Sequence, residues 1–67
     1  MMEVLVNGER RPVGERTTLA ALLESLGLPR DRVAVERNRE IVRRNDWEAV
    51  ELQPGDRLEI VQFVGGG

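Results

Sequence analysis

The chain has 67 residues, and a chain of that length buries only ~60% of the surface it exposes when unfolded. We therefore expect one small domain with no enclosed pocket. It contains no Cys, His, Tyr or Lys, which excludes disulfides, thiolate chemistry, zinc–thiolate sites and histidine acid–base catalysis, and argues against a stand-alone enzyme. The net charge of -2 argues against a nucleic-acid partner, and no apolar run approaches the ~20 residues that span a bilayer, so we predict a soluble, cytoplasmic protein with no membrane partner.

Residues 2–13 are predicted to form a β-hairpin. One side of the first strand carries Met2, Val4 and Val6, which alternate with Glu3, Leu5 and Asn7. The Asn7-Gly8 pair tolerates the positive φ angles of a tight hairpin turn. Pro12 lacks the N–H that a central strand needs, so the return strand is predicted at an edge of the sheet, with Val13 pointing inward.

A helix is predicted to follow, capped by Thr17 or Thr18. Its apolar stripe has the spacing of one helical face and consists of Leu19, Leu22, Leu23 and Leu26. Gly27 suits the left-handed position beyond the helix end, and Leu28-Pro29 completes the stop signal.

The middle of the chain predicts a second hairpin. Residues 33–37 form one strand, Asn38 and Arg39 the turn, and 41–42 a short strand. Asn45 and Glu48 have the spacing of a capping box, which predicts one turn of α- or 3₁₀-helix carrying Trp47.

A final strand is predicted over residues 57–64. Gln53-Pro54-Gly55-Asp56 precedes it and suits a type II turn, because Pro occupies the second position and Gly the third. The order strand, strand, helix, strand, short strand, strand indicates an α+β fold. We predict a ubiquitin-like β-grasp over residues 1–64, with a mixed four- to five-stranded sheet, one main helix packed on one face, and a flexible glycine-rich tail over 65–67.

Three apolar residues are predicted on the sheet face that the helix leaves open. Val61 and Phe63 share their side of the last strand with Arg57 and Glu59, and Leu5 shares its side of the first strand with Glu3. Isolated exposed apolar residues are ordinary, but three on one open face suggest a surface for a partner. We call Leu5, Val61 and Phe63 the docking patch.

The end of the chain, Val64-Gly65-Gly66-Gly67, is the second feature that the fold does not require. Glycine has no side chain, so such a segment can thread a narrow channel into the active site of another protein. The carboxylate of Gly67 is then the reactive group, and its activation depends on ATP and an enzyme supplied in trans. An inert tail is the alternative, since chain ends are commonly disordered.

The sequence resembles the ThiS family, the sulfur-carrier proteins of thiamine thiazole biosynthesis, along its full length. The matching features are Val4-Leu5-Val6-Asn7-Gly8, the leucine-rich helix, Val33-Ala34-Val35, Asn38, Ile41-Val42, Arg44, Trp47, Gly55-Asp56, Leu58-Glu59-Ile60-Val61 and Val64-Gly65-Gly66-Gly67. Arg43 is a departure, because the family usually has Pro there.

This resemblance implies a carrier that acts as a co-substrate and binds no cofactor of its own. An E1-like adenylating partner, ThiF, uses MgATP to convert the Gly67 carboxylate to an acyl-adenylate. A persulfide made by a cysteine desulfurase displaces AMP, and a thiocarboxylate results. Thiazole synthase, ThiG, then takes the sulfur. Gly65 and Gly66 provide reach, the docking patch contacts partners, no residue is catalytic, and we expect the free protein to be a monomer.

Three alternatives stay open at this level. A sulfur carrier for molybdopterin or for tRNA thiolation would share both fold and tail. A ubiquitin-like modifier would join Gly67 to lysines of target proteins. A plain β-grasp interaction domain would carry an inert tail, and truncation of the last two glycines would leave it working.

Overall fold

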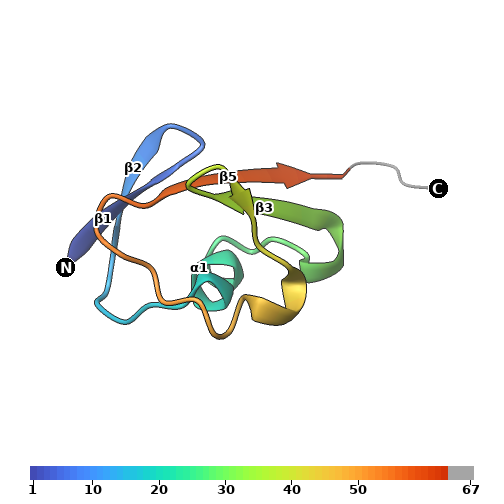
Figure 1. The fold of residues 1–67 in the computed structure, drawn as a ribbon, viewed down its shortest axis with the longest axis horizontal. Helices are drawn as coiled ribbons and strands as arrows, with labels where there is room; N and C mark the ends of the chain where they lie inside the picture. Colours follow the sequence, from blue (N-terminus) through green and yellow to red (C-terminus); the bar gives the residue numbers. More distant parts are fainter. Residues whose placement is uncertain (64–67) are drawn as a thin grey trace.

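The computed structural model describes residues 1–63, which form a five-stranded mixed sheet with one α-helix beneath it (Figure 1). The strands are β1 (Met2–Val6), β2 (Glu9–Val13), β3 (Val33–Arg37), β4 (Glu40–Ile41) and β5 (Arg57–Gln62), in the spatial order β2-β1-β5-β3-β4. β1 and β5 are parallel, and the other neighbours are antiparallel. The element order and the α+β architecture are confirmed.

The first hairpin turns at Asn7-Gly8, as predicted. Both residues have positive φ, 50° and 85°, and the strands pair from Val6 with Glu9 onward. β2 is an edge strand, and Pro12 pairs with Glu3 there without a neighbour on its other side. The second hairpin also has the predicted turn, since Asn38 and Arg39 have φ of 51° and 74°.

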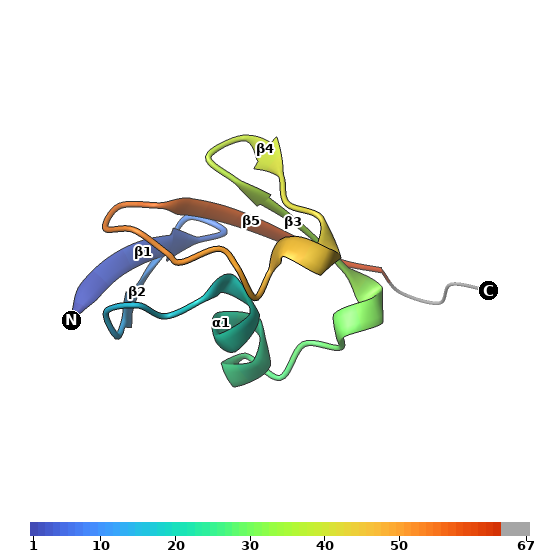
Figure 2. The same cartoon turned by 60° about the horizontal axis from the view of Figure 1, so that its bottom comes forward.

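The helix α1 (Leu19–Ser25) begins at the predicted cap. The Thr18 hydroxyl accepts a hydrogen bond from the Ala21 N–H at 3.1 Å, which satisfies one of the donors left open by the first turn. Three of the four leucines are buried, and Leu26 is the half-buried residue that ends the helix. Gly27 takes the left-handed conformation with φ of 71°. Figure 2 shows α1 on one side of the sheet.

The core lies between α1 and the sheet face that it covers. Its buried apolar residues are Val4, Val6, Val13, Leu19, Leu22, Leu23, Val33, Val35, Trp47, Leu52 and Leu58. Trp47 is the largest of them, and its indole N–H donates to the Val42 carbonyl at 3.1 Å. The indole therefore adds apolar area to the core without leaving a polar group unpaired.

The segment from Trp47 to Leu52 covers the sheet together with the helix. The N–H groups of Leu19 and Ala20 donate to the carbonyls of Val50 and Trp47, at 2.9 and 3.1 Å, and Leu52 N–H donates to Thr17 O at 2.9 Å. Part of the start of α1 is thus capped by a distant segment rather than by its own side chains.

The capping box predicted at Asn45 and Glu48 is wrong, although a single 3₁₀ turn does form there. This turn, η2 (Arg44–Asp46), starts after Arg43 and has no side-chain cap. Asn45 lies inside the turn and cannot cap it, while Glu48 accepts a hydrogen bond from Arg30 at 2.8 Å.

Two further differences concern the ends of strands. An unpredicted 3₁₀ turn, η1 (Arg30–Arg32), leads into β3. β5 ends at Gln62 instead of residue 64, because its partner β3 begins at Val33, opposite Gln62. Val64 and the predicted tail 65–67 lie outside the described residues, and with them the predicted domain boundary. No helix within residues 1–63 is long and apolar enough to cross a membrane.

Candidate functional site

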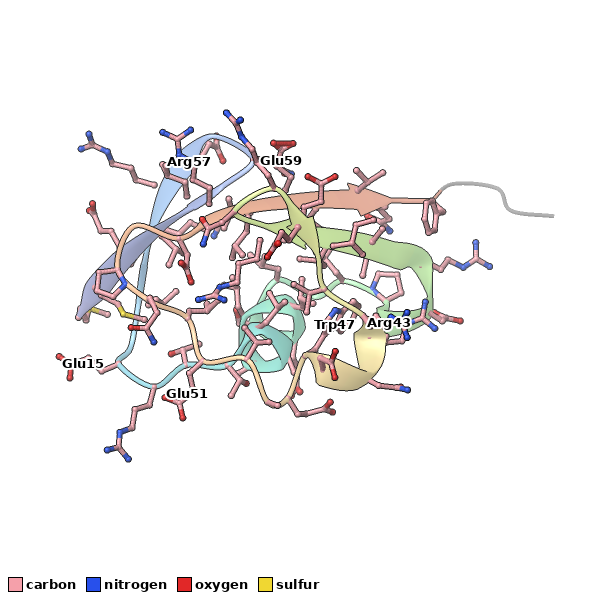
Figure 3. All side chains as sticks on the ribbon, viewed as in Figure 1. Glu15, Arg43, Trp47, Glu51, Arg57 and Glu59 are labelled. Atoms are coloured by element: carbon pink, nitrogen blue, oxygen red, sulfur yellow. The ribbon has the colours of Figure 1, made fainter. Side chains whose placement is uncertain are left out.

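The strand that leads to the glycine segment, β5, lies in the middle of the sheet. It runs parallel to β1 on one side and antiparallel to β3 on the other. Leu58 is buried under the sheet and Ile60 half-buried, whereas Arg57 and Glu59 are exposed. Figure 3 shows Arg57 and Glu59 on the side of the sheet away from α1, with Trp47 close to the helix on the other side.

Two of the three residues of the docking patch, Val61 and Phe63, are exposed. Val61 and Phe63 are 57% and 52% exposed, and Leu5 is half-buried. The pairing of Leu5 with Arg57 puts both on the open face, because directly paired residues share a face. Phe63 lies one residue beyond β5, and its N–H donates to Arg32 O at 2.7 Å, so pairing continues for one residue past the strand.

The structure adds Ile41 to the apolar residues of this face. Ile41 is 77% exposed. It pairs with Glu36, and Glu36 pairs with Glu59, so all three side chains lie on the open face of the sheet. From the sequence, Ile41 was predicted in a short strand and matched to the family, but it was assigned to no face of the sheet. The available signal in the sequence was an apolar residue in a short predicted strand. Its exposure and its place on the open face of the sheet followed only from the structure.

A buried carboxylate holds the start of β5. Asp56 is 5% exposed and accepts hydrogen bonds from Arg37 Nε at 2.8 Å, Asn38 Nδ2 at 3.0 Å and the Gln53 N–H at 2.8 Å. Asn38 Oδ1 also accepts from the Arg57 N–H at 3.0 Å. Burial alone would raise the pKa of Asp56, but the bonds from Gln53, Arg37 and Asn38 together lower it below its ordinary value.

On the β1 side of β5, Asn7 holds the strand through hydrogen bonds. Its Oδ1 accepts from the Ile60 N–H at 2.8 Å, and its Nδ2 donates to the Ile60 carbonyl at 3.2 Å. Its backbone N–H donates to Leu58 O at 2.8 Å. The carboxamide therefore takes the place of one more residue of β1. From the sequence, Asn7, Asn38 and Asp56 were predicted as turn residues and matched to the family, but their contacts with β5 were not predicted.

The proposed reactive residue, Gly67, and the threading residues Val64, Gly65 and Gly66 lie outside the described part of the chain. What residues 1–63 provide is a central strand that ends at Gln62, two positions before that segment, and a sheet face on which Val61 and Phe63 are exposed. Among these residues, no group of acidic side chains is arranged to hold a metal ion.

Comparison with known proteins identifies the family. The ThiS family model matches residues 4–67, so the match includes the terminal glycines. The sulfur carrier protein ThiS of Bacillus subtilis is 48% identical over 50 residues, which cover 75% of this chain and 76% of that protein. The crystal structure of the thiamine biosynthesis protein ThiS from Geobacter metallireducens superposes with a TM-score of 0.82 at 33% identity, covering 98% of this chain and 100% of that one. This likeness confirms the predicted β-grasp.

A longer relative also matches. The thiazole synthase of Paramagnetospirillum magneticum is 47% identical over 66 residues, which are 98% of this chain but 20% of that protein. The chain thus spans about a fifth of the length of the thiazole synthase, so only that part of it is comparable. The match of nearly the whole sequence to the family model, together with the shared fold, shows that the chain belongs to the ThiS family.

Proposed function

We propose that this protein is a sulfur carrier of thiamine biosynthesis, which supplies the sulfur of the thiazole ring as a thiocarboxylate on Gly67. The observation that carries the proposal is the family match through residues 4–67, because it includes both the domain and the glycines that would carry the sulfur. The protein would act as a co-substrate of its partners rather than as an enzyme.

The proposed chemistry has three steps. The Gly67 carboxylate attacks the α-phosphate of ATP in an adenylating enzyme of the ThiF type, and an acyl-adenylate and pyrophosphate form. The terminal sulfur of a persulfide, made by a cysteine desulfurase, attacks the acyl carbon and displaces AMP. A thiol then reduces the resulting acyl disulfide, which leaves the thiocarboxylate on Gly67 and a disulfide on the donor side.

The domain contributes presentation rather than catalysis. The acyl-adenylate, a mixed anhydride, is already a good electrophile, and the thiocarboxylate sulfur is a good nucleophile. The carrier therefore needs only to place its C-terminal end in the active site of each partner enzyme. Val64, Gly65 and Gly66 would enter the active site, and the docking patch would contact the partner. The supply of MgATP and of persulfide is consistent with a cytoplasmic location.

Intact mass spectrometry tests the proposal directly. The protein, the adenylating enzyme, MgATP, a cysteine desulfurase and cysteine are incubated together, and the mass of the carrier is measured before and after. We expect replacement of one oxygen by sulfur, and fragmentation should place it on Gly67. The starting spectrum also verifies that the Gly67 carboxylate is free, as the chemistry requires.

Two controls define the result. Omission of ATP should leave the mass unchanged, and so should removal of Gly66 and Gly67, although the domain should still fold. The thiocarboxylate form should then yield thiazole phosphate with thiazole synthase. A carrier whose mass stays constant with a competent partner, or whose sulfur never reaches the thiazole, contradicts the proposal.

A further inference from the structure

Within residues 1–63, the edge of β5 that faces β1 is covered along only part of its length. β1 pairs with β5 only at Leu5 with Arg57 and Val6 with Leu58. Asn7 extends this pairing to Ile60 through its side chain. The chain then turns back into β2 at Gly8, whereas β5 continues to Gln62 (Figure 1).

The backbone of Gln62 points toward this uncovered edge. On the β3 side, the Arg57 carbonyl accepts from the Asn38 N–H, and the Phe63 N–H donates to the Arg32 carbonyl. On the β1 side, the backbone groups of Leu58 and Ile60 bond to Asn7. Because these directions alternate along a strand, the N–H and carbonyl of Gln62 face the β1 side. Within residues 1–63, no residue of β1 stands opposite Gln62, because the pairing of β1 with β5 ends at Leu58, and Gln62 is exposed.

A surface hollow of about 390 Å³ lies at this edge. Half-buried Leu26, Leu28 and Ile60 contribute apolar walls, and Glu9 and Arg11 of β2 line it as well. Among the described residues, the place that a further strand would occupy is therefore open, with the N–H and carbonyl of Gln62 on one side and apolar side chains for an inward-pointing residue. These are the two requirements for recognition by β-strand addition.

We propose that an extended segment of thiazole synthase adds to the sheet here as a strand, pairing with the backbone of Gln62. This inference rests on the proposed function. Thiazole synthase is the chosen partner because the relative from Paramagnetospirillum magneticum carries a segment like this chain within a thiazole synthase. Pairing at Gln62 would anchor the carrier on its partner two residues before Val64, where the glycine segment begins.

Residue-resolved hydrogen–deuterium exchange tests the pairing. In the free protein the Gln62 amide should exchange at nearly the rate of an unstructured chain, while the Ile60 amide, bonded to Asn7 Oδ1, should be protected. Addition of thiazole synthase should protect Gln62 and leave Ile60 as before. Protection of Gln62 that grows with carrier concentration alone would indicate pairing between two copies and overturn the proposal, as would protection by the adenylating enzyme but not by thiazole synthase.

A pair of variants separates backbone pairing from simple coverage of the surface. Gln62→Pro removes the N–H at the open edge and should leave the fold intact, because no ladder bond of the domain is lost. We expect its affinity for thiazole synthase to fall roughly 3- to 10-fold or more, the equivalent of one backbone hydrogen bond. Gln62→Ala, which changes only the side chain, should bind as the parent does.

The outcomes also separate this inference from the proposed function. If Gln62→Ala and Gln62→Pro weaken binding equally, the side chain rather than the backbone is recognised, and strand addition is wrong. If the thiocarboxylate forms and its sulfur is transferred while the Gln62 amide stays unprotected in the complex, strand addition fails and the carrier function stands. If no complex with thiazole synthase forms, both fail.

Discussion

At the scale of single residues, Asp56 is the one buried charged residue within residues 1–63, and its surroundings explain why burial is tolerated. Three donors satisfy the carboxylate, and one of them, the Arg37 guanidinium, also compensates its charge at 2.8 Å. A buried carboxylate without such partners would be strongly destabilising. Because Asn38 also binds the Arg57 N–H, the network joins the second hairpin to the start of β5.

The lowered pKa of Asp56 predicts a loss of stability in acid. The pKa of Asp56 is lower in the folded protein than in the unfolded chain. The contribution of Asp56 to the free energy of unfolding is therefore complete above the unfolded pKa of about 3.9, and it is lost as the pH falls through the folded pKa. Asp56→Asn should lower the free energy of unfolding at pH 7 by about 1.5–3 kcal/mol, the range for hydrogen bonds to charged groups. Urea unfolding at pH 7 and in acid measures both effects.

The control for this prediction is Asp31→Asn, because Asp31 is exposed on η1. This variant should keep the parent stability and acid dependence. If Asp56→Asn also keeps the full acid dependence, another carboxylate is responsible. Glu48 is the next candidate, since the hydrogen bond from Arg30 lowers its pKa, although it is exposed and its effect should be small.

At the scale of elements, the backbone conformation before the 3₁₀ turn η2 is relevant to Arg43, which stands where the family usually has Pro. Arg43 precedes the turn with φ of -67° and ψ of 146°, which are values that proline adopts without strain. Its N–H donates no hydrogen bond to the residues that the structure describes. The backbone is thus already in the conformation that the family residue would impose.

Arg43→Pro should therefore stabilise the domain, by about 0.4–1 kcal/mol, because it restricts the unfolded chain and costs no native bond. Chemical denaturation midpoints measure the change. Arg39→Pro is the matched control with the same loss of charge, and it should destabilise, since Arg39 has φ of 74°. A destabilised Arg43→Pro variant would show that the Arg43 side chain or N–H has a structural role.

At the scale of the whole molecule, the sheet separates a structural face from a face free for partners. Trp47 is 2% exposed beneath the sheet, with Arg30 stacked 5.3 Å from its ring centre, whereas Phe63 is 52% exposed. The two aromatic residues of the chain should therefore have opposite roles.

Phe63→Asp should weaken binding to the adenylating enzyme more than it weakens folding. Trp47→Ala should do the reverse, because truncation of a buried Trp typically costs about 3–5 kcal/mol and a domain of this size has little stability to spare. Thermal unfolding and a binding titration on each variant measure the two effects. If Phe63→Asp lowers the unfolding temperature as much as Trp47→Ala does, Phe63 belongs to the core rather than to the docking patch.

Much of the fold was predictable because its signals are local. The Asn-Gly turn, the Thr18 cap with its leucine stripe, and the Gln53 to Asp56 turn each depend on the conformational preferences of neighbouring residues, and each formed as expected. The errors arose where a local signal had a distant competitor. Glu48 matched a capping box but pairs with Arg30, 18 residues away.

The sequence by itself determined the order of the helix and strands, the family and the candidate reactive residue, Gly67, because periodicity, turn chemistry and the glycine segment are properties of short stretches. Only the tertiary structure decided how β5 is held and where it is left open. Asn7 and Ile60 are separated by 53 positions, and their hydrogen bonds depend on strand order and register. The same register shows that the backbone of Gln62 faces an uncovered edge, which no local pattern encodes.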